Sequence, residues 1–417
     1  MSVHAETKSA ACLVCGGRSL SLFLDLGATA LANKFLSSEE LACPEPTYPL
    51  RVAFCPDCTH VQLLDRVPPA AMFANYLYVS SASETLKRHF DELSALLIER
   101  EKPGHGDLVV DIGCNDGTLL AAFRRNAPEG VRTLGVDPAE NLEGFTRDLG
   151  IERYTGLFTS DSARKIRERW GEAAVITATN TFPHIQDLHD FAAGITELLA
   201  PNGVFVIEAH YLPDLLKQTA FDTVYHEHVS YWALRPMMRL FEQHGLRVMD
   251  AERLPIHHGQ LRVYVKRQGQ GEPSPNVAAL LDRESAEGLD RLETYRAFAQ
   301  KVERLKTELL GKLAELQAQG KSVVGYGAPA KGTTLLNYLE LGPANLAYIV
   351  DKSRLKQGLF VPGVRIPVVP TERLLEDRPD FVLLLAWNFQ EEIIEQQVEY
   401  RKLGGRFITP VPEVRVV

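Results

Sequence analysis

Between residues 107 and 265, short apolar runs alternate with amphipathic stretches. The runs are DLVVDIG, TLGVD, AVITATN and GVFVIEA, and stretches such as TLLAAFRR and DFAAGITELL lie between them. This alternation predicts strands and helices in βαβ units around a mainly parallel sheet. The same pattern restarts at residue 322, where VVGYG, LAYIVD and FVLLLAW predict strands and PAKGTTLLNYL predicts a helix. The sequence therefore predicts two α/β units.

The segments outside these units follow other patterns. Residues 1–70 combine cysteines and prolines with short apolar runs, which indicates a small β-rich module. Residues 276–319 have apolar side chains at steps of three or four, from Leu289 to Leu316, and charged residues on the opposite face. This stripe predicts one or two helices that pack on a neighbouring domain or on a second copy of the chain. We expect an N-terminal module (1–70), an α/β domain (71–268), a helical connector (269–319) and a second α/β domain (320–417).

Composition and charge narrow the classes of function. The chain has 417 residues, of which 45% are hydrophobic and 24% charged, and its net charge is −9. An acidic chain without a basic stripe is not expected to bind nucleic acid. No apolar run approaches the roughly 20 residues that span a bilayer, and the polar start MSVHAETKSA lacks the apolar core of a signal peptide. We expect a cytoplasmic protein without a membrane partner. The pattern does not fix the oligomeric state, although it favours a monomer.

Four of the six cysteines form two pairs. Cys12 and Cys15 are separated by two residues, 39 residues follow, and Cys55 and Cys58 repeat the spacing. Two such turns can close a tetrahedral zinc site with no open position, so we predict a structural zinc ion in the N-terminal module. The alternatives are four unrelated buried thiols or a redox pair, and the paired spacing favours the metal. The other two, Cys43 and Cys114, are interpreted as ordinary buried residues.

The first glycine turn of the larger α/β unit has a polar lining. In VVDIGCNDG a strand ends at Asp111, Gly113 makes the turn, and Asn115 and Asp116 precede a helix. The turn lacks the G-x-G-x-x-G pattern on which a pyrophosphate rests. Its acidic lining suits a cationic or neutral ligand with an amino-acid end.

Two later strand ends complete this candidate cofactor site. Asp137 ends the next strand, where a carboxylate accepts hydrogen bonds from ribose hydroxyls, and Asn180 ends the AVITATN strand. The pattern resembles that of class I S-adenosylmethionine methyltransferases, and the alternative is a generic Rossmann-like strand end. The resemblance implies that Asp111 and Gly113 border the methionine part, that Asp137 holds the ribose and that Asn180 lies near the cofactor.

Several further stretches, in order along the whole chain, resemble one family. They are the paired cysteines, ANYLYVSSASET, DIGCNDG, NTFPHIQDL, FDTVYHEHVSYW, HHGQLRV, GYGAPAKGTTLLNY and LLAWNF. Together they are similar to the sugar C-methyltransferases that act on nucleotide-linked keto-deoxysugars, such as the dTDP-sugar C-3 methyltransferase of tetronitrose biosynthesis. The resemblance implies a zinc module, a class I methyltransferase domain and a Rossmann-like C-terminal domain. One departure is Gln260, where the family pattern HGGSLR has serine.

Methylation of carbon next to a ketone needs a base, a donor to the enolate oxygen and alignment of the reactants. We expect His228 to be the base, Tyr225 to assist proton transfer or donate to the enolate oxygen, and Glu227 to orient the sugar. The resemblance supports a set that comprises His228, Tyr225, Glu227, His184 and either Tyr76 or Tyr78, with Tyr76 preferred. A metal site that uses His226 and His228, or a polar cluster at a domain seam, remains the alternative interpretation.

The C-terminal unit contains a second glycine turn before a helix, which can form an anion site or be only a tight turn. The resemblance implies that this domain holds the nucleotide diphosphate of the sugar, with Lys331 neutralising phosphate and with Asp351 and Asn388 at further strand ends. Binding of NAD is the disfavoured alternative.

The predicted function is S-adenosylmethionine-dependent C-methylation of a dTDP-linked 4-keto-6-deoxysugar at C-3, in deoxysugar biosynthesis. The alternatives are methylation at C-5, methylation at oxygen or nitrogen, and a non-catalytic scaffold that binds cofactor and sugar nucleotide.

Overall fold

The first of the three β-sheets formed by the described residues is built from two distant parts of the chain. The computed structural model describes residues 11–73, 79–256 and 259–417. This sheet has the antiparallel order β1 (Ser21–Thr29), β2 (Tyr48–Phe54), β3 (Val61–Leu63) and β9 (Ser230–Tyr231). A short helix, α1 (Pro69–Phe73), follows β3. Because β9 comes from inside the predicted 71–268 segment, that segment completes the sheet of the N-terminal module.

The second sheet has seven strands in the order β10-β11-β8-β7-β4-β5-β6. Its parallel strands are β4 (Leu108–Ile112), β5 (Arg132–Asp137), β6 (Glu152–Thr155), β7 (Ala173–Thr179) and β8 (Leu199–His210). The antiparallel strands β11 (Gln260–Arg267) and β10 (Leu246–Leu254) extend it at one edge. Asp111 and Asp137 lie on β4 and β5, and Asn180 directly follows β7. Because these strands are parallel, their carboxyl ends form one edge of the sheet, as the βα alternation predicts.

Helices cover both faces of the seven-stranded sheet. One face packs on α2 (Glu84–Glu101) and α3 (Thr118–Asn126) through leucine and phenylalanine side chains. The other face packs on α5 (Ser160–Trp170), α6 (Leu188–Leu198) and α8 (Leu234–Glu242). Short helices α4 (Glu143–Asp148) and α7 (Leu212–Lys217) follow β5 and β8. This three-layer arrangement is the class I methyltransferase fold that the sequence predicts.

The third sheet has the order β14-β13-β12-β15-β16-β17. Its strands are β12 (Val323–Tyr326), β13 (Ile349–Val350), β14 (Val368–Val369), β15 (Phe381–Leu384), β16 (Arg406–Thr409) and β17 (Arg415–Val416), and only β17 is antiparallel. Its helices are α11 (Ala330–Tyr338), α12 (Arg373–Asp377), α13 (Gln390–Gln396) and α14 (Val398–Lys402). This sheet matches the second α/β unit predicted from the sequence.

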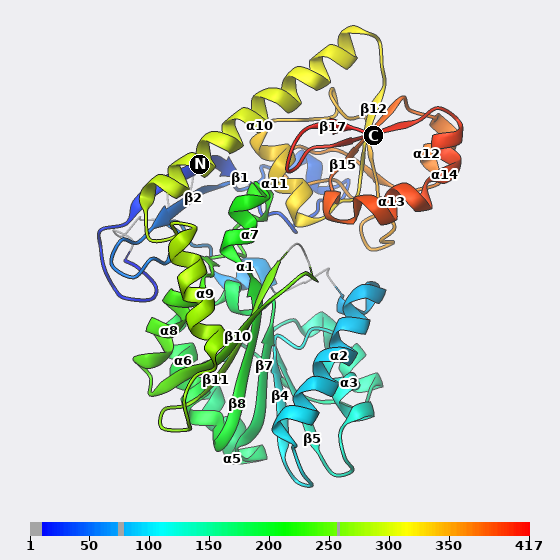
Figure 1. Cartoon of the computed structure of the whole chain (residues 1–417). Coiled ribbons are helices and arrows are strands. Elements are labelled where there is room, and N and C mark those ends of the chain that lie inside the picture. Colours follow the sequence, from blue (N-terminus) through cyan, green and yellow to red (C-terminus); the bar gives the residue numbers. More distant parts are fainter. Residues whose placement is uncertain (1–10, 74–78, 257–258) are drawn as a thin grey trace.

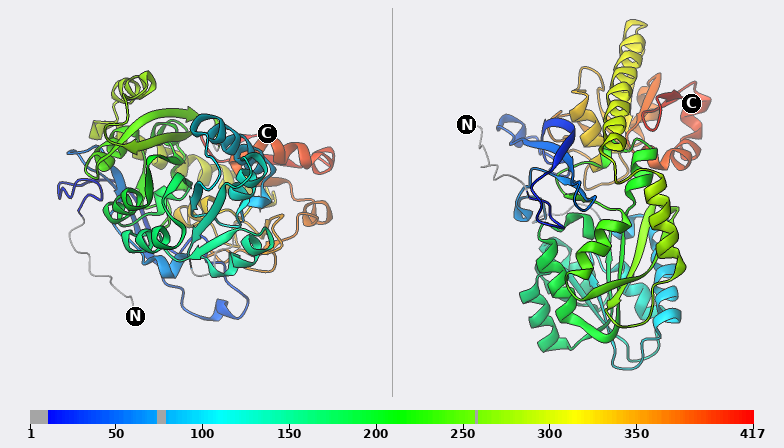
Figure 2. Two further views of the ribbon diagram at one scale, coloured as in Figure 1. Left: turned by 90° about the horizontal axis from the view of Figure 1, so that it is seen from below. Right: turned by 60° about the vertical axis from the view of Figure 1, so that its left-hand side comes forward.

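A long helix joins the first and third sheets. After α9 (Pro275–Ala286), α10 (Leu292–Ala318) runs along one side of the molecule (Figures 1 and 2). The ring of Tyr295 lies 4.7 Å from that of Phe54 and 5.1 Å from that of Phe23. The rest of its apolar stripe shares one core with the C-terminal sheet. The predicted stripe therefore packs on neighbouring parts of the same chain.

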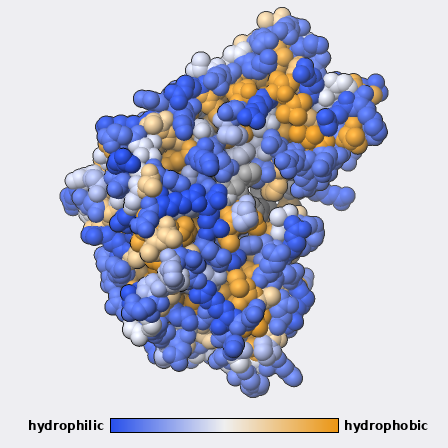
Figure 3. Space-filling model, in the orientation of Figure 1, coloured by the Kyte–Doolittle hydropathy of each residue, from blue (hydrophilic) through white to orange (hydrophobic). Residues whose placement is uncertain are grey.

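Hydrophobic and hydrophilic residues are interspersed on the face seen in Figure 3. Among the described residues, no helix is both long and apolar enough to cross a membrane.

Leu309→Ala should lower the free energy of unfolding by about 2–5 kcal/mol, because it leaves a cavity where α10 meets the shared core. Glu308→Ala, on the exposed face of the same helix turn, is the matched control and should change stability by less than about 0.5 kcal/mol. Denaturant unfolding measures both variants. Equal free energies of unfolding for Leu309→Ala and Glu308→Ala would contradict the packing of α10 against the shared core.

Candidate active site and metal centre

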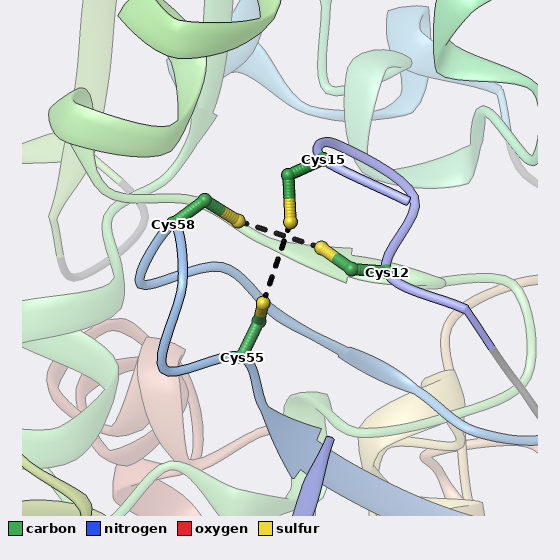
Figure 4. A group of neighbouring side chains, drawn as sticks. All are labelled: Cys12, Cys15, Cys55 and Cys58. Carbon is green, nitrogen blue, oxygen red and sulfur yellow. Dashed lines mark hydrogen bonds between the residues drawn. The ribbon is translucent and has the colours of Figure 1, made fainter. Parts of the chain in front are cut away.

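The four paired cysteines converge on one point (Figure 4). The Sγ atoms of Cys12 and Cys58 lie 3.4 Å apart, and those of Cys15 and Cys55 lie 3.6 Å apart. All four sulfur atoms lie within 4.8 Å of one another. A zinc ion bound by four thiolates at about 2.3 Å requires sulfur separations of about 3.8 Å. The cysteines therefore fit a tetrahedral zinc ion.

The two turns that carry these cysteines share one backbone geometry. In the first, the N–H of Gly16 donates to the carbonyl of Cys12, and the N–H of Cys12 donates to the carbonyl of Gly17. In the second, Thr59 and His60 make the equivalent bonds with Cys55. The fifth residue of each turn has a positive φ, 71° at Gly16 and 63° at Thr59. Because a β-branched residue rarely adopts this conformation, the second turn keeps a strained shape that a bound metal stabilises.

Metal coordination also resolves the electrostatics of the sulfur cluster. The thiol of Cys58 lowers the pKa of Cys12 to about 5, whereas burial raises the pKa of Cys55 to about 12. Four neighbouring thiolates repel one another unless a cation lies between them. Cys114 is buried as predicted, but the prediction for Cys43 was wrong, because Cys43 lies on an exposed loop.

The second cysteine turn, which carries Cys55 and Cys58, lies next to the segment YHEHVSYW at residues 225–232. Strand β3, which follows Cys58, pairs with β9, so that Val61 lies opposite Tyr231 and Gln62 opposite Ser230. The ring of His60 adds a 3.2 Å contact from Nε2 to Oγ of Ser230. The zinc turn and the predicted catalytic segment are therefore joined by backbone pairing.

The glycine turn after β4 is shaped by close contacts. Gly113 has φ +76°, and a Cβ there would lie 1.9 Å from Oγ1 of Thr181, so only glycine fits. Burial raises the pKa of Asp111 to about 7, and Oγ1 of Thr177 donates to this carboxylate at 2.7 Å. Asp116 instead accepts from the N–H of Ser81 and from Thr118, at the start of α3. The sequence predicted Asp116 in the cofactor lining, whereas the structure shows its carboxylate hydrogen-bonded to Ser81 and Thr118 of the protein itself.

Asp137 and Asn180 lie at the carboxyl ends of β5 and β7, the two strands on either side of β4. One Asp137 oxygen accepts from the N–H of Asn115 at 2.9 Å, and the other accepts from the N–H of Ala139 at 2.8 Å. This fixes the carboxylate at the edge where β4 and β5 end. Asn180, with φ +58°, donates its N–H to the carbonyl of Glu208 on β8. The acids and the asparagine predicted for the cofactor thus come together at one sheet edge.

Tyr225, His184 and His228 form one cluster at the same edge. The Tyr225 hydroxyl lies 2.9 Å from Nε2 of His228, and Nδ1 of His228 lies 2.8 Å from the carbonyl of Thr223. Since a carbonyl only accepts, Nδ1 carries the proton and Nε2 accepts from the tyrosine. The His184 ring stacks on His228 with 5.1 Å between centroids. Burial, followed by the proximity of the titratable rings of His184 and His210, lowers the pKa of His228 well below its ordinary value. The imidazole is therefore neutral at pH 7.

His210 belongs to this cluster, and the sequence analysis missed it. It is the last residue of β8, and its ring centroid lies 5.3 Å from that of His228. The rule that found Asn180 at the end of β7 would also have found His210, because the two strands are parallel neighbours.

The C-terminal domain supports the backbone beside His228. The indole Nε1 of Trp387 donates to Oδ2 of buried Asp222 at 2.6 Å. Asp222 precedes Thr223, whose carbonyl accepts from His228. Lys331 lies with its Nζ 5.3 Å from the Trp387 ring centroid, and its charge opposes protonation of His228 while favouring ionised Asp222. Lys331 therefore lies beside the histidine cluster as well as at the start of α11.

Glu227 is buried between the N-terminal module and the C-terminal domain. Both of its carboxylate oxygens accept from Nδ2 of Asn33, at 2.8 and 3.0 Å. Burial raises its pKa to about 7, and the charge of Lys356 works against that rise. Asn33 belongs to the N-terminal module and Lys356 to the C-terminal domain. Neither residue has a local sequence signal, and both were missed.

His226 points away from this cluster. Its Nε2 lies 3.2 Å from the carbonyl oxygens of Tyr48 and Pro49. Among the described residues, the four cysteines are the one group of histidine, cysteine and acidic side chains close enough to share a metal ion. This geometry disfavours the alternative in which His226 and His228 bind a metal.

The C-terminal turn after β12 repeats the geometry of the turn after β4. Gly327 has φ +82° and donates to the carbonyl of Val350, as Gly113 donates to Val136. Asp351 then accepts from the N–H groups of Ala328 and Ser353, at 2.6 and 2.7 Å, as Asp137 does from its own two neighbours.

Of the three remaining predicted site residues, the structure describes Asn388. Asn388 is half-buried just beyond β15, which neighbours β12. Tyr76 and Tyr78 lie outside the described residues.

Fold and site together define a class I α/β methyltransferase with an N-terminal four-cysteine centre. Three family models match the chain: "Putative zinc binding domain" over residues 12–73, "Methyltransferase domain" over 79–251 and "C-methyltransferase C-terminal domain" over 255–412. The chain is also similar to the C-methyltransferase NovU of Streptomyces niveus, with 39% identity over 97% of this chain and 96% of that protein. The chain therefore belongs to this C-methyltransferase family and is an S-adenosylmethionine-dependent C-methyltransferase with a zinc-binding domain. This confirms the predicted family, enzyme class and cofactors.

Solved structures match only part of the chain. The PH0226 protein of Pyrococcus horikoshii covers 48% of this chain and 97% of its own length, at 16% identity and a TM-score of 0.37. An S-adenosylmethionine-dependent methyltransferase of Clostridium acetobutylicum covers 44% and 92%, at 12% identity and a TM-score of 0.35. Similarity at this level adds nothing to the fold assignment, which rests on the strand order and the family models.

Cys55→Ser should reduce bound zinc from about one ion per chain and lower the melting temperature, because a buried ligand of a four-thiolate site is lost. Cys43→Ser, in the exposed loop, should retain both zinc and stability. Elemental analysis and thermal unfolding measure the two effects. Equal zinc content in both variants would contradict the assignment of Cys55 as a ligand.

Proposed function

We propose that the enzyme methylates a carbon next to the ketone of a dTDP-linked 4-keto-6-deoxysugar, at C-3. The supporting observation is the hydrogen-bonded pair of Tyr225 and His228 at the sheet edge where the strands bearing Asp111 and Asp137 end. S-adenosylmethionine supplies an electrophilic methyl group when it is bound. What the protein must add is a way to make carbon nucleophilic, and a buried neutral imidazole next to a tyrosine hydroxyl does this.

The proposed proton transfer follows the direction of the hydrogen bonds. The carbonyl of Thr223 holds the proton of His228 on Nδ1, which leaves the lone pair of Nε2 facing the Tyr225 hydroxyl. In our proposal the Tyr225 oxygen takes the proton from the carbon next to the ketone while its own proton passes to Nε2. The electrons of the C–H bond form the enolate. With S-adenosylmethionine bound, the enolate carbon would take its methyl group while the methyl–sulfur bond breaks and the electron pair of that bond stays on sulfur. His228 is the final proton acceptor and Tyr225 the group that contacts the sugar.

The other predicted residues have supporting roles in this proposal. His184 stacks on His228 and lines the sugar side of the cluster. Glu227, near Lys356, orients a hydroxyl or amino substituent of the sugar. The predicted cofactor roles of Asp111, Gly113, Asn115, Asp137 and Asn180 are retained, whereas Asp116 acts as a support for the turn.

The nucleotide is proposed to bind the C-terminal domain. The repeat of the Asp137 turn at Asp351 supports binding of a second nucleoside, because a strand-end carboxylate held by backbone N–H groups accepts from sugar hydroxyls. Lys331 would face the diphosphate where it passes the histidine cluster, and Asn388 lies on the neighbouring strand end. The proposed substrate thus extends from the C-terminal domain to the base. We propose that the enzyme acts in the cytoplasm as a monomer.

Purified enzyme, methyl-labelled S-adenosylmethionine and dTDP-4-keto-6-deoxyglucose test the function. We expect label on a sugar carbon, and in deuterated water without the cofactor we expect deuterium at C-3. Deuterium at C-5 would reassign the position, whereas label on oxygen or nitrogen, or no label with any nucleotide-linked ketosugar, would overturn the proposal.

His228→Asn should lower both turnover and deuterium exchange at least 100-fold, because general-base assistance contributes roughly 10²–10⁴-fold. The matched control is His189→Asn, because His189 is a half-buried histidine whose Nδ1 lies 2.9 Å from Nε2 of His244, which is not part of the cluster around His228. The control should keep its activity within about twofold. If His228→Asn exchanged deuterium into the sugar as fast as the parent enzyme, His228 would not be the base.

A further inference from the structure

Gln260 has a buried oxygen without a hydrogen-bond partner in the part of the chain that the structure describes. The residue is fully buried at the start of β11, and its Nε2 donates to Oδ1 of Asn180 at 2.6 Å. Its Oε1 is also buried, and within residues 11–73, 79–256 and 259–417 no group donates to it. A buried amide oxygen without a hydrogen bond costs free energy, so its persistence beside a candidate site points to a ligand that completes it.

The position of Gln260 in the sheet indicates which ligand that is. Gln260 lies directly opposite His210 in the β8–β11 pairing, and His210 contacts His228. Strand β11 is three strands from β4, or about 14 Å at the usual spacing of about 4.8 Å. Donors on the cofactor would meet the acids on β4 and β5, whereas the Gln260 oxygen lies on the side of the histidine cluster. The geometry therefore favours the sugar over the cofactor.

The backbone before Gln260 holds the amide in place. Gly259 has φ +114°, and a Cβ there would lie 2.1 Å from Oδ2 of Asp214. Asp214 is itself bound by Arg253 through two hydrogen bonds of 2.6 Å. The carbonyl of Gly259 also accepts from the N–H of Tyr211. Gly259 thus has a restricted backbone directly before Gln260, and the side chain of Gln260 is held by Asn180.

We propose that Gln260 is a specificity-determining residue whose Oε1 accepts a hydrogen bond from a ring hydroxyl of the ketosugar, near the carbon that is methylated. This inference rests on the proposed function. A neutral amide suits the position, because a carboxylate there would favour the protonated form of the neighbouring histidines and weaken the base. The hydroxyl would satisfy the amide oxygen and align the sugar between Asn180 and His228.

Gln260→Leu, which keeps the size of the side chain, tests the proposal with dTDP-4-keto-6-deoxyglucose as the probe. We expect kcat/KM for the sugar to fall about 10- to 100-fold, as for the loss of a hydrogen bond in a buried site. The dissociation constant for S-adenosylmethionine should change less than twofold. Analogues of the probe that each lack one ring hydroxyl provide the second arm. One of them should be used equally well by parent and variant, because the lost partner is then absent from both.

Gln62→Leu separates this role from a purely structural one. Gln62 is also a buried glutamine, but its Oε1 accepts from the N–H of Leu13 at 2.7 Å. Gln62→Leu should lower the melting temperature more than Gln260→Leu does, because the N–H of Leu13 then loses its hydrogen-bond partner.

An unchanged kcat/KM for Gln260→Leu, a loss that appears in cofactor binding instead, or an equal loss with every analogue would overturn the assignment. If the parent enzyme itself methylates no ketosugar, the proposed function fails, and that result is distinct from an active parent with an indifferent variant.

Discussion

The pairing of β3 with β9 joins two parts of the chain on which the catalytic segment depends. Two residues separate Cys58 from the start of β3, and one residue separates His228 from the start of β9. Only two residue pairs form the ladder, and the contact of His60 with Ser230 reinforces it. So short a ladder has little stability of its own. The zinc centre at one end provides binding energy that fixes it, and the position of the histidine segment follows.

The environment of His228 suits a proton acceptor that works away from water. Its ring is surrounded by Tyr225, His184 and His210, and burial together with these neighbours disfavours the imidazolium ion. His228 is therefore unprotonated before the substrate arrives, as its proposed role as the base requires. When a proton reaches it, the same surroundings make the charged state costly, which favours release of that proton to solvent after the methyl transfer.

The sequence contains enough information for the parts of the fold that depend on local pattern. The cysteine spacing, the βα alternation and the strand-end residues Asp111 and Asp137 each express a rule that acts over a few residues. Tyr225 and His228 could be predicted as a pair because their chemistry matches the proposed reaction, and the structure places them within hydrogen-bonding distance. Asn33 and Lys356 could not, because their contacts with Glu227 join segments far apart in the chain and leave no local pattern. Lys331 lies at the predicted helix start, but its closeness to Asp222 depends on how the domains pack.

The contacts between Asn33, Glu227 and Lys356 form in a fixed order during synthesis, because the amino end of a chain leaves the ribosome first. The seven-stranded sheet is complete once β11 has emerged at Arg267. Lys356 and Trp387 follow much later, after the whole of α10. During that interval a nascent chain has every strand of the methyl-donor sheet, while Glu227 and the backbone before His228 lack their C-terminal supports. The last domain to be made is thus the one that completes the proposed catalytic centre, so that an unfinished chain is expected to be unable to use up the methyl donor.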